Sequence, residues 1–285
     1  MINHKIQPCR KLILAIVMMV AGFASAADRE EPRNFDQARD LLSLHYDHAP
    51  DKDDGHSAAA DRTILESLYG RDWIKKHTVA VSGAYGKNAK TFNVESDRVM
   101  DAVWSDCGGW LAGHTNREQV VTGLFERWSN ILANGGDIWV KEGGQSDITA
   151  DVVRLIQRQT PDLITTQRIH VVQHSKWNEN QTTESALEYT KKHTHYIRIK
   201  DANRFLNVKG GNKEFEEAAT QHPIFGASWR AAFAYYDAKE RLDFSDTGEL
   251  LRILNLGEIS IDDFRRTYFQ WVDKAHIGVV PKIVP

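Results

Sequence analysis

Residues 41–57 read LLSLHYDHAPDKDDGHS, and this stretch decides the fold class. Its first six residues, Leu41–Tyr46, form a short strand-like run, and an acidic loop separates them from a helix pattern that begins at about Ser57. A strand that leads into a helix is the repeating unit of a parallel sheet. We therefore predict an α/β fold with a mostly parallel central sheet flanked by helices.

The same alternation continues along the chain. Ligands of such sheets gather beyond the carboxyl ends of the strands, so functional residues are expected directly after strands. Further strands are predicted at Val79–Val81, Ile138–Lys141, Ile169–Gln173 and Tyr196–Ile199, and helices at Ala58–Leu68, Asp97–Trp104, Glu118–Leu132, Ala150–Gln157, Glu184–Lys192 and Glu214–Gln221.

The first 26 residues have the pattern of a secretory signal peptide, with a basic start, an apolar stretch at Leu12–Phe23 and a small-residue ending, Ala24-Ser25-Ala26. This pattern predicts a periplasmic or secreted protein. Residues 27–285 are expected to form a single domain, because no linker, repeat or low-complexity block divides them. No segment after the signal is apolar and long enough to span a bilayer.

The net charge bears on the binding partners that are expected, and the cysteine content bears on disulfide bonds. The full chain has a net charge of −3, and loss of the basic signal residues makes the remainder more acidic. An acidic protein is a poor match for nucleic acid or an anionic membrane surface. Cys9 leaves with the signal, so Cys107 has no intramolecular disulfide partner and is expected to be a packed, inert thiol. The oligomeric state stays open, a homo-oligomer included.

The loop after the first strand concentrates four carboxylates in eight residues: Asp47, Asp51, Asp53 and Asp54. Such a set repels itself unless a cation or bound water compensates, and hard oxygen ligands of this kind suit calcium or magnesium. A solvated acidic loop that ends in a helix-capping Asp is an equally simple interpretation. A further alternative is a zinc or other transition-metal site that uses nearby histidines. These are His45, His48 and His56.

This loop resembles the opening signature of the nucleoside hydrolase family, a strand followed by Asp-x-Asp-Pro-x-x-Asp-Asp. Asp47, Asp53 and Asp54 fall in register with it. The second Asp of the family, a calcium ligand, is replaced here by Ala49. The resemblance therefore implies that either Asp47 or Asp51 supplies the missing oxygen.

Further segments match the family in the same order along the chain. Residues 143–150, GGQSDITA, resemble Gly-Pro-Leu-Thr-Asn-Ile-Ala, and Ser146 takes the place of the Thr whose main-chain carbonyl binds calcium. The segment Lys176-Trp177-Asn178 resembles Glu-Phe-Asn. This similarity implies that Asn178 bonds a ribose hydroxyl and that Trp177 excludes water from the sugar.

The last matching segment, residues 242–251, resembles the His-Asp-x-x-Ala-x-Ala helix start of the family. The resemblance implies that Asp246 is a calcium ligand and that it also caps the following helix. Ser245 stands where many members have a His that protonates the leaving base. Leaving-group activation and a preference for purine nucleosides are therefore not implied.

Together these segments resemble the motifs of the nucleoside hydrolases. The resemblance implies a calcium-dependent hydrolase of N-glycosidic bonds in nucleosides or related ribosides. Calcium would be bound by Asp54, Asp246, the Ser146 carbonyl and either Asp47 or Asp51. A general base is needed to activate water against an oxocarbenium-like sugar, and the family match assigns that role to Asp53. The expected partner is a small-molecule nucleoside or sugar.

Two other functions stay open. Ala49 and Ser245 remove a ligand and an acid of the family, which favours a non-catalytic exported protein that binds a carbohydrate or nucleoside. The second alternative is a metal-dependent hydrolase of phosphate esters or of another glycoside. A phosphate needs a convergent set of cations near Asp53. The candidates are Lys52, Lys141 and Lys176.

Overall fold

The computed structural model describes residues 34–237 and 239–269. The predicted signal peptide, with Cys9, lies outside the described residues. All described residues belong to one compact unit. Within these ranges, no helix is both long and apolar enough to cross a membrane.

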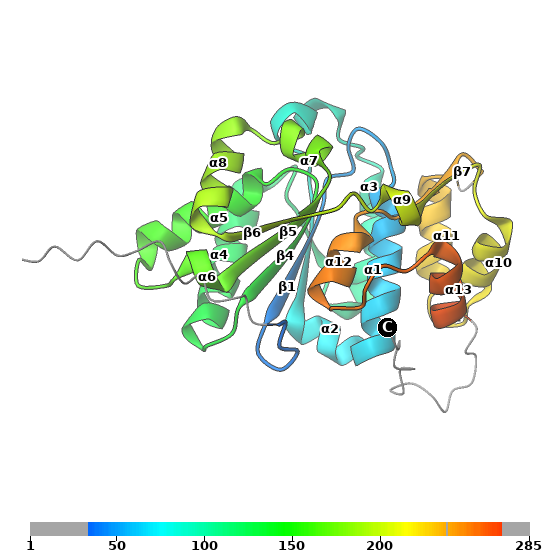
Figure 1. Ribbon diagram of the computed structural model, residues 1–285, viewed down its shortest axis with the longest axis horizontal. Coiled ribbons are helices and arrows are strands. Elements are labelled where there is room, and N and C mark those ends of the chain that lie inside the picture. The colour runs from blue at the N-terminus through cyan, green and yellow to red at the C-terminus, as the bar shows by residue number, and fades with distance from the viewer. Residues whose placement is uncertain (1–33, 238, 270–285) are drawn as a thin grey trace, which may run out of the picture. The chain divides into compact units, whose positions relative to one another are not determined.

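Six parallel strands form the central sheet, which confirms the predicted α/β class (Figure 1). Their order across the sheet is β3-β2-β1-β4-β5-β6, so the direction of winding reverses between the adjacent strands β1 and β4. Loops that leave a sheet at such a reversal part from each other and make room for a ligand. The strands are β1 (Leu41–Tyr46), β2 (Thr78–Ser82), β3 (Trp110–Ala112), β4 (Ile138–Gly143), β5 (Ile169–His174) and β6 (His195–Ile199).

All five predicted strands are present, and the differences lie at their ends. β4 runs on through Glu142 to Gly143, and β5 runs on to His174, since these polar side chains are buried rather than exposed. The edge strand β3 was not predicted, because three half-buried residues give too short a pattern. A small antiparallel pair, β7 (Asn207–Lys209) and β8 (Arg241–Asp243), was also missed.

Each predicted helix is present in the structure. α1 begins at Asp54 rather than near Ser57, so this carboxylate lies in the first helical turn. Free backbone N–H groups and the helix dipole favour a negative charge there. The predicted helices are α1 (Asp54–Tyr69), α3 (Ser96–Trp104), α4 (Arg117–Ala133), α5 (Asp147–Gln159), α8 (Glu184–His193) and α10 (Lys213–Gln221). The others are α2 (Arg71–His77), α6 (Thr165–Arg168), α7 (Lys176–Gln181), α9 (Asn203–Leu206), α11 (Gly226–Tyr235), α12 (Thr247–Ile253) and α13 (Ile261–Phe269), with short 3-10 turns η1 (Gly86–Thr91) and η2 (Ser105–Cys107).

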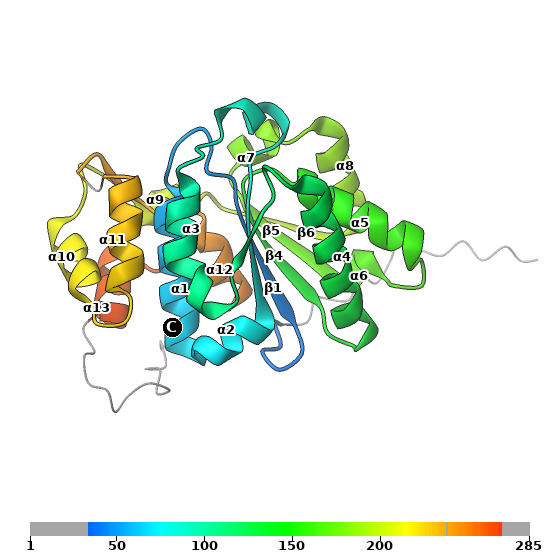
Figure 2. The same ribbon diagram turned by 180° about the vertical axis from the view of Figure 1, so that it is seen from behind.

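Helices cover both faces of the sheet, with α1 and α12 on one face and α4 and α5 on the other (Figures 1 and 2). Side chains alternate between the faces along each strand. Leu44 and Tyr46 belong to the core cluster that includes residues of α1 and α12, whereas Leu41 belongs to the cluster of Trp128 on α4. Polar residues at the carboxyl ends of β1, β4 and β5 are consequently enclosed by apolar layers.

Candidate functional site

Two asparagines from the segment that follows β2 hold the acidic loop at the carboxyl end of β1 by hydrogen bonds to its carbonyls. The side-chain amide of Asn93 donates to the carbonyls of His48 (2.7 Å) and Asp51 (3.0 Å). Asn88 donates to the carbonyl of Ala49 (3.1 Å). These bonds satisfy loop carbonyls that no regular element pairs. Neither asparagine was predicted, although Asn88 follows a predicted strand.

Three carboxyl groups lie close together beyond β1: Asp47 and Asp54 from the acidic loop, and Asp246 from the segment before α12. The charges of Asp246 and Asp47 both act on the carboxyl of Asp54. Within the described residues, no donor reaches Oδ1 of Asp54. Its Oδ2 accepts the backbone N–H of His48 at 2.7 Å. All three side chains are buried, and Asp54 is only 1% exposed. We call these three residues the acidic centre.

Burial is the largest influence on the acidic centre. It raises the pKa of Asp54 well above the usual 3.8, and the charges of Asp246 and Asp47 raise it further. Burial likewise raises the pKa of Asp47 to about 7. Buried carboxyls that lie close together cannot all ionise unless protons or cations compensate them.

Asp53 lies half-buried at the outer side of the acidic centre. Burial, and after it the charge of the exposed Asp51, raises the pKa of Asp53 well above 3.8. A carboxylate with a raised pKa is a stronger proton acceptor than an exposed one. The raised pKa of Asp53 is a property that a general base needs, and the catalytic role of Asp53 stays a prediction.

One internal cation of this region is His174, the last residue of β5. Its Nε2 lies 2.5 Å from Asp246 Oδ1, and its Nδ1 lies 3.6 Å from Asp201 Oδ1. Burial disfavours the imidazolium, but these carboxylates outweigh it and raise the pKa of His174 well above 6.5. The carboxylate of Asp246 makes no capping bond to α12, so the predicted capping role is wrong: the side chain turns to His174 instead.

A second internal cation, Lys141, points from β4 to the same side of the sheet. It is completely buried, and its Nζ lies 3.5 Å from Asp61 Oδ2 and 4.0 Å from the ring centroid of Tyr46. Burial disfavours the ammonium, yet Asp61, Asp246 and other carboxyls raise the pKa of Lys141. A lysine on a buried strand therefore keeps its charge.

The glycine turn after β4 packs directly against Asp47 of the acidic centre. Gly144 has φ +127°, and a Cβ on it would lie 2.4 Å from Cβ of Asp47, so only glycine fits. The neighbouring Gln145 amide donates to Asp47. The carbonyl of Ser146, the predicted calcium ligand, accepts the N–H of Ala150 at 2.9 Å as the first bond of α5.

The predicted sugar-binding residues lie on α7, next to η1 rather than within the acidic centre. Trp177 is 46% exposed, whereas Asn178 is buried and donates its backbone N–H to Ser175 Oγ. Among the described residues, neither side chain hydrogen-bonds to the acidic centre. The structure places them on the same edge of the sheet and leaves their contact with a ligand as a prediction.

The three histidines considered for zinc do not converge. His45 lies on the opposite face of the sheet, with Nδ1 3.0 Å from Glu142 Oε1 and Nε2 3.0 Å from Ser43 Oγ. His56 Nε2 lies 3.0 Å from the carbonyl of Tyr236. His48 alone is near the acidic centre, and burial lowers its pKa to about 3. A site built on all three is not supported.

Cys107 has the environment expected of an inert thiol. It is buried and free of disulfides in the described part of the chain. Burial raises its pKa to about 12, so a thiolate is disfavoured.

The acidic centre has the donor chemistry of a site for a hard divalent cation, but not the arrangement of one. Within residues 34–237 and 239–269, no group of three His, Cys, Asp or Glu residues has the arrangement of a metal site. The carboxylates of the acidic centre are nevertheless the oxygen donors that calcium prefers. Folded proteins leave few buried polar atoms unsatisfied, and each exception calls for an explanation. Those without a hydrogen-bond partner here include Asp54 Oδ1, both ring nitrogens of His48, Lys141 Nζ, Tyr235 Oη and Glu249 Oε2.

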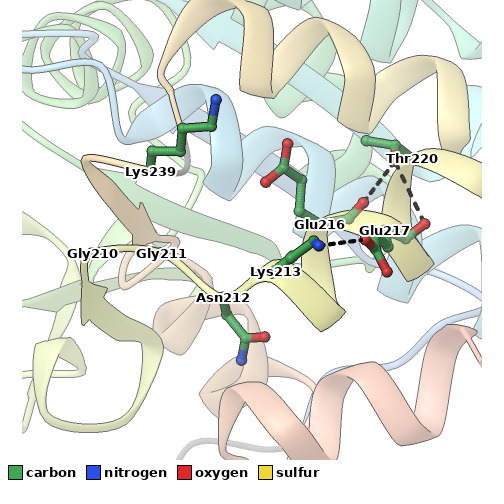
Figure 3. Close-up of a pocket in the computed structure, with 8 residues that line it drawn as sticks. All are labelled: Gly210, Gly211, Asn212, Lys213, Glu216, Glu217, Thr220 and Lys239. Atoms are coloured by element: carbon green, nitrogen blue, oxygen red, sulfur yellow. Dashed lines mark hydrogen bonds and ion pairs between the residues drawn. The ribbon is translucent and has the colours of Figure 1, made fainter.

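A surface pocket lies elsewhere, between the loop after β7 and the start of α10 (Figure 3). It has a volume of about 310 Å³ and is lined mainly by polar side chains. Lys213 lies 3.5 Å from Glu217, and Thr220 donates to the carbonyl of Glu216 at 2.7 Å. These groups partner one another, and none of them belongs to the acidic centre.

Comparisons with models of protein families, with characterised proteins and with solved structures find no match to this chain. The functional assignment therefore depends on the residues of the acidic centre and their surroundings.

Proposed function

We propose that the protein is an exported, calcium-dependent hydrolase of N-glycosidic bonds in nucleosides or related ribosides. One observation carries the proposal. The buried carboxyls of Asp47, Asp54 and Asp246 lie near one another at the winding reversal of the sheet, where α/β proteins bind ligands. Burial raises the pKa of Asp54 and of Asp47, whereas Asp246 has a lowered pKa because the bond to His174 and nearby positive charges together outweigh the effect of burial. Buried groups with pKa values perturbed in this way are typical of a functional site.

Asp47, Asp54 and Asp246 would hold the calcium ion. When bound, such a cation supplies a Lewis acid that binds vicinal hydroxyls and lowers the pKa of water. Asp53 would accept a proton from the attacking water, since its half-buried carboxyl has a raised pKa. The remaining carboxylates would favour the positive charge that develops on the sugar ring.

The same charges disfavour a phosphate ester as the substrate. Lys52 Nζ lies 3.1 Å from Glu95, and Lys141 is buried beside Asp61. Lys176 is exposed on α7. The three candidate cations thus face different surroundings, and no clamp for a phosphate near Asp53 is formed by the described residues. Anionic substrates would be repelled by the acidic centre.

A non-catalytic binding protein is the second candidate, and Ser245 favours it. Ser245 is 3% exposed and its backbone N–H donates to Asp243 Oδ1 at 3.1 Å. A buried serine next to a carboxylate is a poor proton donor for a leaving base. Hydrolysis would then depend on leaving groups that need little protonation.

The test is release of reducing sugar from a panel of nucleosides, with calcium or with a chelator. Wild type should release sugar only with calcium, and Asp53→Asn should slow it at least about 100-fold because the general base is lost. Asp72→Asn is the control: it removes an exposed carboxylate on α2, outside the acidic loop, and should stay within about threefold of wild type. Calorimetric binding of a nucleoside without turnover would select the binding protein. Absence of both binding and turnover would overturn both candidates.

A further inference from the structure

Lys141 is an unusual residue to find enclosed in an apolar layer. Its side chain is 0% exposed, and its Nζ makes no hydrogen bond within the described structure. The ammonium lies 3.5 Å from a single carboxylate oxygen, on Asp61, and that oxygen also accepts the hydroxyl of Tyr46 at 2.7 Å. A buried ammonium is costly to desolvate, so it is retained only where nearby charges compensate it.

Those charges include the acidic centre itself. A methyl group on Gly143 would lie 2.9 Å from Lys141 Nζ and 3.2 Å from Asp246 Oδ2, so the ammonium and the carboxylate flank the same glycine. The attraction of Lys141 also acts on Asp54. His174, the other internal cation, is by contrast held by the exposed carboxylate of Asp201 as well as by Asp246.

We propose that the Lys141 ammonium is a built-in counter-cation of the acidic centre that weakens its affinity for a divalent cation; the inference rests on the calcium-binding role proposed above. The ammonium occupies the inner side of the carboxylate cluster, towards Tyr46 and Asp61. A divalent cation bound by Asp54 and Asp246 lies near this like charge, which low-polarity surroundings screen poorly. The same ammonium lets the cluster fold without a metal.

The consequence is a centre that responds to calcium concentration rather than holding the ion permanently. Without the ammonium, the carboxylates carry more uncompensated negative charge and should bind a divalent cation more tightly. Removal of an ordinary buried lysine would only lower the stability of the fold and would not raise the affinity for calcium.

The test is calorimetric titration of calcium chloride into the purified protein and its variants. Lys141→Met should bind calcium at least tenfold more tightly than wild type. Because that change leaves Asp61 without its cation, the double variant Lys141→Met/Asp61→Asn is titrated as well and should also bind at least tenfold more tightly. Lys52→Met is the matched control, since it removes a lysine that pairs with Glu95 on the outer side of the loop. Its affinity should change less than threefold.

Several outcomes separate this inference from the proposed function. Tighter binding in both Lys141 variants, abolished by adding Asp54→Asn, supports the inference even where no nucleoside is hydrolysed. Equal affinities in wild type and both Lys141 variants would overturn it, and so would an absence of calcium binding in all of them. A melting temperature that rises with calcium more in Lys141→Met than in wild type would support it independently of catalysis.

Discussion

The two ends of the central sheet differ in how their buried polar groups are satisfied. At the amino end, Asp40 accepts the N–H of Asp137 (2.9 Å) and the indole N–H of Trp139 (3.0 Å). Asp137 in turn lies 2.9 Å from Arg168 Nε and 3.1 Å from His170 Nε2. At the carboxyl end, Asp54 lies near the carboxyls of Asp47 and Asp246. Among the described residues, Asp54 Oδ1 and both ring nitrogens of His48 have no hydrogen-bond partner.

This difference separates polar groups that serve the fold from those that serve a ligand. A polar group that stabilises the fold must be matched within the chain, because an unmatched one costs the desolvation it suffers. Groups kept for a ligand are matched only when the ligand binds, and they reduce stability in its absence. Substitutions at the two ends should therefore have opposite effects on stability.

The largest effect is expected at the amino end. Asp137→Ala leaves the half-buried Arg168 and the buried His170 without their carboxylate, and should lower the free energy of unfolding by about 3 kcal/mol. Urea denaturation monitored by tryptophan fluorescence measures the change. A loss below about 1 kcal/mol would mean that the polar groups at the amino end of the sheet stabilise the fold no more than those at the carboxyl end.

The pH dependence of stability sharpens the comparison at the carboxyl end. The pKa of Asp47 is about 7 in the folded protein and near 3.8 when unfolded, so the folded state binds the proton more tightly. The resulting stabilisation is fully present below the unfolded value and is lost as pH rises through 7. In chelator, the unfolding free energy should fall by about 2 kcal/mol more between pH 5 and pH 8 in wild type than in Asp47→Asn. Parallel curves for the two proteins would argue against a proton on the acidic centre.

A smaller effect of opposite sign is expected for Asp54→Asn. The amide oxygen can still accept the N–H of His48, while repulsion from Asp47 and Asp246 is removed. In chelator this variant should be more stable than wild type by about 1 kcal/mol, yet inactive. Thermal melts in chelator and the nucleoside assay measure the two properties. Destabilisation as large as that of Asp137→Ala would show that both ends serve the fold.

The smallest effect on stability is expected where the loop is fastened. Asn93→Ala removes the side-chain donor shared by the carbonyls of the buried His48 and the exposed Asp51. The His48 carbonyl keeps the backbone N–H of residue 93 as a donor, at 3.1 Å. Global stability should change by about 1 kcal/mol or less, because water can replace the amide. Activity should fall about tenfold, since the loop positions Asp53. Hydrogen exchange of the loop amides provides the direct check of its mobility.

The sequence predicts the sheet and the approach of distant acids, but not the internal cations. Strand and helix patterns are local, so five of the six strands of the central sheet were predicted. Asp54 and Asp246 lie near enough for the charge of Asp246 to act on the pKa of Asp54. Whether those residues bind calcium stays a prediction. Lys141 and His174 follow no local rule: only the packing of α1 and α12 shows that these strand residues face carboxylates rather than solvent.

Other features depend on geometry that a motif does not record. The Ser146 carbonyl accepts the N–H of Ala150 in the first turn of α5, and its role as a calcium ligand stays a prediction. The capping role predicted for Asp246 fails because His174 competes for the same carboxylate. The bond to the Ser146 carbonyl depends on the exact residue at which α5 begins. The bond between Asp246 and His174 joins residues that are distant in the sequence.

The most direct test of the account is calcium binding by wild type and Asp54→Asn, measured by calorimetric titration at neutral pH, with Asp72→Asn as the control. Wild type and Asp72→Asn should each bind one calcium ion, and Asp54→Asn should bind none. Calcium binding that survives Asp54→Asn unchanged, or no binding by wild type, would contradict the claim that the acidic centre is a cation site.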